Sequence, residues 1–210
     1  MAEIKNPDGS LQLQNPEAEI VSKLALDLVT GYYAYVSAIS LAIDIRSDKL
    51  IPEVLPNQIV PVGFVKSKGD PLAHTFDFRL YLEQARENEF VINQLERVYL
   101  TGALLSIGDA LIDHKYFNDF HSPIFQLIRH LRNGIAHGNK FDIRNSQELI
   151  DHPAHDRVPQ NHNPTKFQIT PELNGTNVLF DFMDPGDILN TLHQAGFHLM
   201  DLACGVEKMT

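Results

Sequence analysis

Residues 123–138 read PIFQLIRHLRNGIAHG, a pattern typical of a helix with one apolar side. Ser122 is a typical N-cap residue and Pro123 suits the first turn, so a helix is expected to begin here and to end at Gly138. At about 100° per residue, four apolar side chains fall in one narrow stripe. This stripe predicts a helix packed against a core: Ile124, Ile128, Leu131 and Ile135.

The opposite side of the same helix carries a row of amide and imidazole groups. A solvated helix face is normally filled with Lys and Glu. The row therefore indicates a function other than solvation: Gln126, His130, Asn133 and His137.

Arg132 lies between the two stripes, five positions before His137. On an ideal helix their Cβ atoms diverge by about 140°, so one straight helix does not bring them together. The Arg132 side chain could curl back, the helix could loosen near Gly134, or a second copy of the helix could supply the missing half. Gly134 costs about 1 kcal/mol relative to alanine and permits close backbone approach, which favours two helices meeting at a twofold axis. We therefore expect a homodimer.

The first half of the chain is predicted to be largely helical. Asn15, Pro16 and Glu17 form a helix start, and the helix should run to about residue 46. Four prolines then predict an irregular Pro-rich loop over 47–75, with a short extended piece at 59–64. Helical apolar spacing predicts one long or broken helix over 78–114.

The second half is predicted to add a small β element. Residues 139–165 have the composition of a polar loop with little to bury. Alternating residues around Asn174-Gly175 predict a β-hairpin over 166–182. A last helix is expected over 184–206. The prediction is therefore one mainly α domain over 1–210, a helical bundle with a small β-hairpin before the last helix.

Composition narrows the function classes. The formal net charge of −10 argues against sequence-blind coating of nucleic acid, so any phosphate contact must be local. Cys204 is the single cysteine, which excludes an internal disulfide and fits a reducing compartment. The N-terminus has no export signature, and the apolar run 28–43 is short for a membrane span. We expect a cytoplasmic protein with no membrane contact and a buried helix over that run.

The segment from Arg132 through Asn133 to His137 resembles the motif of HEPN domains, in which an arginine, often followed by a polar residue, precedes a histidine by a few positions. The resemblance implies a helical bundle that dimerises across the motif helix. It also implies a metal-independent endoribonuclease of a toxin–antitoxin or defence system, with RNA as substrate and a cognate antitoxin as partner. Asn139 stands where toxins paired with nucleotidyltransferase antitoxins often have tyrosine, so the resemblance does not extend to that pairing.

The chemistry of these residues suits RNA cleavage without a metal or cofactor. A histidine such as His137 can act as acid or base, and Arg132 offers planar, charged donors to phosphate oxygens. Asn133 could orient His137 or donate to phosphate. In a dimer, two imidazoles would serve the two proton transfers.

Four further residues would supply the local positive field for RNA binding: Arg129, His130, Lys140 and Arg144. The alternative for each is an ordinary surface charge, because cations are favoured near the C-terminal end of a helix.

Rival functions depend on other residues. A catalytically silent HEPN-like module would bind a nucleotide, RNA or protein through the same cleft. A metal hydrolase would use the histidines and carboxylates of 151–156 with His162, although a mobile polar loop is the simpler interpretation. Tyr32, Tyr33 and Tyr35 could stack on a nucleobase, but aromatics on such a helix are more often core residues.

Overall fold

The computed structural model describes residues 15–44, 61–67, 70–119, 122–158 and 165–206. These residues are mainly helical, as the sequence predicted. Packing divides the chain into two compact units, 1–31 with 97–210 and 32–96, which are described separately below. That all of 1–210 acts as a single domain stays a prediction.

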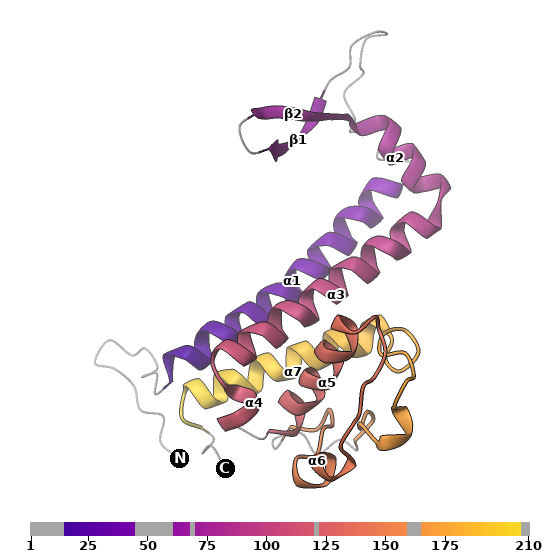
Figure 1. The fold of residues 1–210 in the computed structure, drawn as a ribbon. Helices are drawn as coiled ribbons and strands as arrows, with labels where there is room; N and C mark the ends of the chain where they lie inside the picture. The colour runs from indigo at the N-terminus through magenta and orange to yellow at the C-terminus, as the bar shows by residue number, and fades with distance from the viewer. Residues whose placement is uncertain (1–14, 45–60, 68–69, 120–121, 159–164, 207–210) are drawn as a thin grey trace, which may run out of the picture. The chain divides into compact units, whose positions relative to one another are not determined.

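Helices make up most of the first unit (Figure 1). Two long helices have one end in each unit: α1 (Pro16–Ile43) and α3 (Glu89–Asp113). The others lie within the first unit: α4 (Tyr116–Asp119), α5 (Pro123–Ala136), α6 (Ser146–Asp151), the 3-10 helix η2 (Pro171–Leu173) and α7 (Pro185–Ala203).

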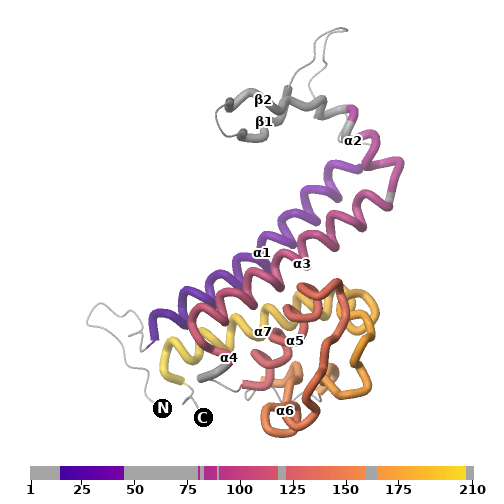
Figure 2. The backbone as a smooth tube through the Cα atoms, viewed as in Figure 1, coloured from indigo at the N-terminus to yellow at the C-terminus, as the bar shows by residue number. Residues whose placement is uncertain are grey.

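The first unit is a bundle in which each of four helices contacts the next. Tyr99 of α3 donates its hydroxyl to the Leu28 carbonyl of α1 at 2.8 Å, and Ser22 of α1 donates to the Gly196 carbonyl of α7 at 2.7 Å. Phe125 of α5 lies against the His198 ring of α7, with ring centroids 5.2 Å apart. Figure 2 shows α5 and α7 side by side. The predicted α5 stripe is largely confirmed, because three of its members are fully buried: Ile124, Ile128 and Leu131.

Asparagine side chains cap the starts of α1 and α3. Asn15 Oδ1 accepts the Ala18 N–H at 3.1 Å at the start of α1. The broken helix predicted over 78–114 is confirmed as α2 (Phe78–Glu87) and α3. The break is at Asn88, whose Oδ1 accepts the Phe90 N–H at 3.1 Å. Such side-chain oxygens satisfy amide groups that have no partner inside the helix.

The segment 139–165 differs from the open polar loop that was expected. It contains α6, and within its described part three apolar side chains are buried: Phe141, Ala154 and Val158. Its backbone is bonded to other elements, since the His155 N–H donates to the Pro123 carbonyl at 3.1 Å. The segment is therefore part of the packed unit.

The β-hairpin predicted over 166–182 is wrong. Gln168 forms an isolated bridge with His155, and Asn177 forms one with Lys140, while η2 lies between them. The two halves of the expected hairpin pair with the preceding segment instead of with each other. Non-local pairing of this kind leaves no signal in the turn sequence.

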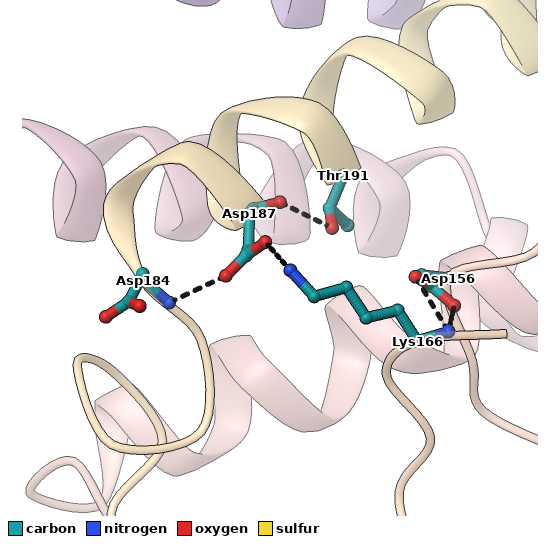
Figure 3. Close-up of polar contacts among 5 residues, drawn as sticks. All are labelled: Asp156, Lys166, Asp184, Asp187 and Thr191. Carbon is teal, nitrogen blue, oxygen red and sulfur yellow. Dashed lines mark hydrogen bonds and ion pairs between the residues drawn. The ribbon is translucent and has the colours of Figure 1, made fainter.

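The start of α7 is held by charged groups (Figure 3). Asp187 accepts the Asp184 N–H at 3.2 Å and the Lys166 ammonium at 2.6 Å. The Lys166 N–H in turn donates to the Asp156 carboxylate at 3.1 Å. A carboxylate in the first turn also complements the positive end of the helix dipole.

The second unit contains parts of α1 and α3, together with α2 and a strand pair. Strands β1 (Pro61–Ser67) and β2 (Asp70–Asp77) pair antiparallel, so the loop expected over 47–75 is a β-hairpin in its described part. Residues 45–60 lie outside the described residues. Arg86 donates to the Ala42 carbonyl at 3.0 Å and thereby caps the end of α1.

The helix over 28–43 was expected to be buried, and only part of it is. Val29 and Tyr32 are buried, but the following turns expose large apolar side chains: Tyr33, Val36, Leu41 and Ile43. Helix α1 is long and apolar enough to cross a membrane by length and composition, a test that core helices and signal sequences also pass.

Candidate functional site

Helix α3 orients Arg132 of the motif. The stem of Arg132 crosses α3 at Gly108, where an added Cβ would lie 2.5 Å from Arg132 Cγ. Beyond it, Arg132 Nε and Nη2 donate to Asp109 Oδ1 at 3.0 and 2.8 Å. Arg132 Nη1 lies 3.4 Å from Asn133 Oδ1. Gly108 and Asp109 therefore position the arginine, and sequence reasoning missed both because neither carries a signal without knowledge of the packing partner.

Arg132 and His137 make no direct bond to each other in the described part of the chain. His137 is the C-cap of α5, and its N–H donates to the Asn133 carbonyl at 3.1 Å. Its side chain is exposed, and no hydrogen bond or ion pair joins it to Arg132 among the described residues. Curling of Arg132 towards His137 is therefore not observed, and assembly from two copies stays a prediction.

Gly134 has a role different from the one expected. An added Cβ would overlap Val178 Cγ2 and lie 3.0 Å from the Lys140 carbonyl oxygen. The close approach that glycine permits is thus made by later segments of the same chain. The argument for a twofold axis at Gly134 is wrong, because this side of the helix is already covered.

Gln126 does not belong to an outward-facing row. It is 1% exposed, and its Nε2 donates to the Phe117 carbonyl at 3.0 Å. Its assignment to the side away from the core is wrong because α4 covers this side of α5. A wheel describes one helix and cannot show a second element packed on its flank.

The predicted RNA-binding cations differ in availability. Arg129 Nη1 donates to Glu148 Oε1 at 2.7 Å, and Arg144 is paired with Asp142 at 2.5 Å. Hydrogen bonding from Arg144 is the main cause of the lowered pKa of Asp142, with a smaller contribution from His137. Lys140 is exposed and has no side-chain ion pair among the described residues.

His130 is half-buried beside Arg129. Burial lowers the pKa of His130, the charge of Arg129 lowers it further, and Glu148 opposes both effects. A histidine with a lowered pKa is mostly neutral at pH 7. At that pH the His130 imidazole can therefore donate one hydrogen bond and accept another, but it contributes little positive charge to RNA binding.

A small pocket opens between the end of α3, α4 and α5. Its volume is about 190 Å³, and it is lined by Ile112, Lys115, Phe117, Arg129 and Asn133. Sequence reasoning named Arg129 and Asn133 but missed the other three. The sequence signal that could have indicated the pocket was Lys115, because it is a cation directly after a helix, where positive charge is favoured.

The histidine-rich segment 151–156 is used in the structure of the loop itself. His155 Nδ1 accepts the Arg157 N–H at 3.2 Å, and Asp156 accepts the Lys166 N–H. Within the described ranges, no group of three or more His, Cys, Asp and Glu side chains could hold a metal ion. His162 lies outside the described residues.

Of the three tyrosines proposed to stack on a nucleobase, Tyr32 is buried and Tyr33 is exposed. The Tyr32 hydroxyl donates to the Glu96 carboxylate, and burial is the main cause of the raised pKa of Tyr32. The Tyr32 ring also makes an edge contact with Tyr33, with ring centroids 6.0 Å apart. Tyr32 is therefore a core residue, as the simpler interpretation expected.

Comparisons with protein-family models, curated proteins and solved structures found no match to this chain. The resemblance to HEPN domains accordingly rests on the motif residues 132–137.

Proposed function

We propose that the chain is a metal-independent endoribonuclease of the HEPN type, with Arg132 and His137 as its catalytic residues. The observation that supports this most is the placement of the motif on α5. Arg132 is held in one orientation by Asp109, and His137 stands exposed at the end of the same helix. The setting would be a cytoplasmic toxin–antitoxin or defence system, with a cognate antitoxin as partner.

The reaction needs two proton transfers and stabilisation of charge. A base removes the proton of the ribose 2′-hydroxyl, and the 2′-oxygen attacks the adjacent phosphorus. The bond to the 5′-oxygen breaks, and an acid protonates that oxygen, leaving a 2′,3′-cyclic phosphate and a 5′-hydroxyl. Imidazole is suited to both transfers, and a guanidinium is suited to the charged phosphorane.

Two copies of the chain would complete this site. His137 of each copy would serve one proton transfer, and Arg132 would hold the phosphate. Asn133 would orient the imidazole or donate to phosphate. No hydrogen bond or ion pair joins Arg132 to His137 among the described residues, which supports a site assembled from two copies.

The test is cleavage of single-stranded RNA by the purified full chain in EDTA. We expect Arg132→Ala and His137→Ala each to lower the rate at least about 100-fold, which is typical for loss of a charge-stabilising donor and of a general acid or base, respectively. Matched controls are Arg157→Ala and His193→Ala, which remove exposed residues elsewhere and should cleave like wild type. Unchanged cleavage in either motif variant would refute the proposal.

Mixing wild type with an excess of His137→Ala tests the two-copy site. A heterodimer would keep only one of the two imidazoles, so the cleavage rate per wild-type chain should fall after subunit exchange. An unchanged rate, despite heterodimer formation, would contradict a site that uses both copies.

The second candidate is a catalytically silent binding module. It is favoured by the pairing of Arg132 with Asp109 and of Arg144 with Asp142, which occupies two of the cations. RNA binding that depends on Arg132, without any cleavage product, would favour this candidate over the nuclease.

A further inference from the structure

The part of helix α1 that lies in the second unit is largely uncovered. Between Ala18 and Tyr32 a residue of α1 is buried in every turn, whereas none of residues 33–43 is buried. We propose that residues 33–43 of α1 and 90–95 of α3, here called the arm, form an interface on which the arm of a second copy of the chain packs. This goes beyond the proposed function and does not rest on it, because the arm contains none of the motif residues.

The arm exposes large apolar side chains on both of its helices. Leu41 is 72% exposed and Phe90 is 65% exposed. A pair of helices cannot bury its apolar sides alone, since stable domains pack at least two layers against each other. The arm therefore offers a face for a further layer. The large apolar side chains exposed on it are Tyr33, Val36, Leu41, Ile43, Phe90, Val91 and Leu95.

The spacing of these residues favours a helical partner. On α1, Tyr33, Val36, Ser40 and Ile43 recur at intervals of three, four and three residues. Residues three and four apart lie on one side of a helix, and their alternation is typical of helices that pack side by side. The arm of a second copy supplies two such helices.

The absence of charge on this part of α1 favours an identical partner. Residues 28–43 contain no Asp, Glu, Lys or Arg, in a chain with a formal net charge of −10. Like charges that face each other across an interface are costly, so two acidic surfaces repel, whereas two uncharged helices meet without that cost. A twofold axis then places the same surface on both sides of the contact.

The exposed apolar area is close to what a stable homodimer needs. At roughly 100 Å² for a fully exposed aliphatic side chain and roughly 200 Å² for an aromatic one, the seven side chains expose about 500 Å² of apolar surface. A standard interface buries about 800 Å² on each partner, and about 65% of a homodimer interface is apolar. One interface between two arms can therefore cover these side chains.

A charged neighbour on α3 argues against insertion of the arm into a membrane. The Tyr32 hydroxyl donates to the Glu96 carboxylate directly beside the arm, and Arg97 follows Glu96 in the sequence. Charged side chains are costly in the centre of a bilayer. A protein interface tolerates such charges, because its rim is polar and accessible to solvent.

The experiment is light scattering of the purified full chain over a range of concentrations. We expect the wild-type particle to have about twice the mass of the Leu41→Asp and Phe90→Asp particles. Each substitution occurs twice in a twofold interface and places charge in it, so the dissociation constant should rise at least about 100-fold. Aspartate at position 90 lies in the first turn of α3, where negative charge is favoured, so that variant should keep its helical circular dichroism.

Ile20→Asp is the matched control. Ile20 is 60% exposed and lies on the same helix, but it belongs to the first unit. Ile20→Asp should therefore keep the mass of wild type. The proposal would be overturned by equal dissociation in Ile20→Asp, by an unchanged mass in both arm variants, or by a wild-type monomer at the highest soluble concentration.

Sedimentation with vesicles of phosphatidylcholine and phosphatidylglycerol tests the membrane alternative. Wild type should stay in the supernatant, because the arm packs on another chain. Binding to the vesicles that is lost in Leu41→Asp would show that the arm contacts lipid, and it would overturn the assignment to a second copy.

Motif variants separate this proposal from the nuclease. Leu41→Asp should halve the mass in the wild-type and His137→Ala backgrounds alike, whether or not RNA is cleaved. The two proposals can therefore fail independently. Dissociation in Arg132→Ala but not in Leu41→Asp would place the self-interface at the motif helix and overturn the role of the arm. Together with pairing across the motif helix, the arm would give an assembly of four chains.

Discussion

Gly134 offers a sharp test of the packing around the motif helix. An added Cβ would overlap Val178 Cγ2 and lie 3.0 Å from the Lys140 carbonyl oxygen. Gly102 of α3 is the matched control, because it also lies inside a helix but has nothing within 4 Å of an added Cβ. The two glycine-to-alanine changes therefore differ mainly in the room available to the added methyl group.

The expected magnitudes have opposite signs. Replacing an exposed helical glycine by alanine stabilises a helix by about 1 kcal/mol, so Gly102→Ala should raise the free energy of unfolding by up to that amount. Overpacking costs about 1–3 kcal/mol, and the upper end applies at Gly134 because the Lys140 oxygen belongs to the backbone and cannot rotate away. After the helix gain is subtracted, Gly134→Ala should lower the free energy of unfolding by about 2 kcal/mol.

Urea unfolding followed by circular dichroism measures both changes. For a chain of this size 1 kcal/mol corresponds to about 2–4 °C, so Gly134→Ala should also lower the melting temperature by about 4–8 °C. Gly134→Ala as stable as wild type, together with a stabilised Gly102→Ala, would refute the packing of Val178 and Lys140 on α5.

Two other predictions concern α7. Burial lowers the pKa of His198 to about 4. Below about pH 6.5 the unfolded chain takes up a proton that folded His198 does not, so stability should fall by about 2 kcal/mol from pH 7 to pH 5. Urea unfolding of His198→Gln at both pH values should show a smaller fall, and an equal fall would contradict the assignment. Asp187→Asn removes the charge near Lys166 and the helix end, and should cost about 0.5–1 kcal/mol by the same assay. The loss should shrink in a Lys166→Met background, and a loss unchanged there would exclude the ion pair as a contributor.

Local patterns in the sequence determined where most helices begin. Asn15 before Pro16, Ser122 before Pro123 and Asp184 before Pro185 each precede an observed helix, because caps and first-turn prolines act within a few residues. The Ser122 side chain makes no cap bond and contacts the His198 ring instead, so Pro123 was the informative residue there. The apolar stripe of α5 could also be predicted from the sequence, since a helix with one apolar side buries that side against the core.

The candidate site was predictable only in part. The segment from Arg132 to His137 was identified from the order of its residues, and the structure places both on α5 or at its end. The partner of Arg132 could not be identified from the sequence, because Asp109 lies on another helix. The pocket formed with Lys115 was missed for the same reason: its lining comes from three elements.

The features that could be predicted from the sequence are therefore local: the helical class, most helix starts, and the motif at the end of α5. The neighbours that cover each helix face follow from tertiary packing. It buried Gln126 under α4, packed Val178 on Gly134, and paired 166–182 with the preceding segment instead of folding it into a hairpin. These outcomes depend on contacts between residues far apart in the chain, and no spacing within one element encodes them.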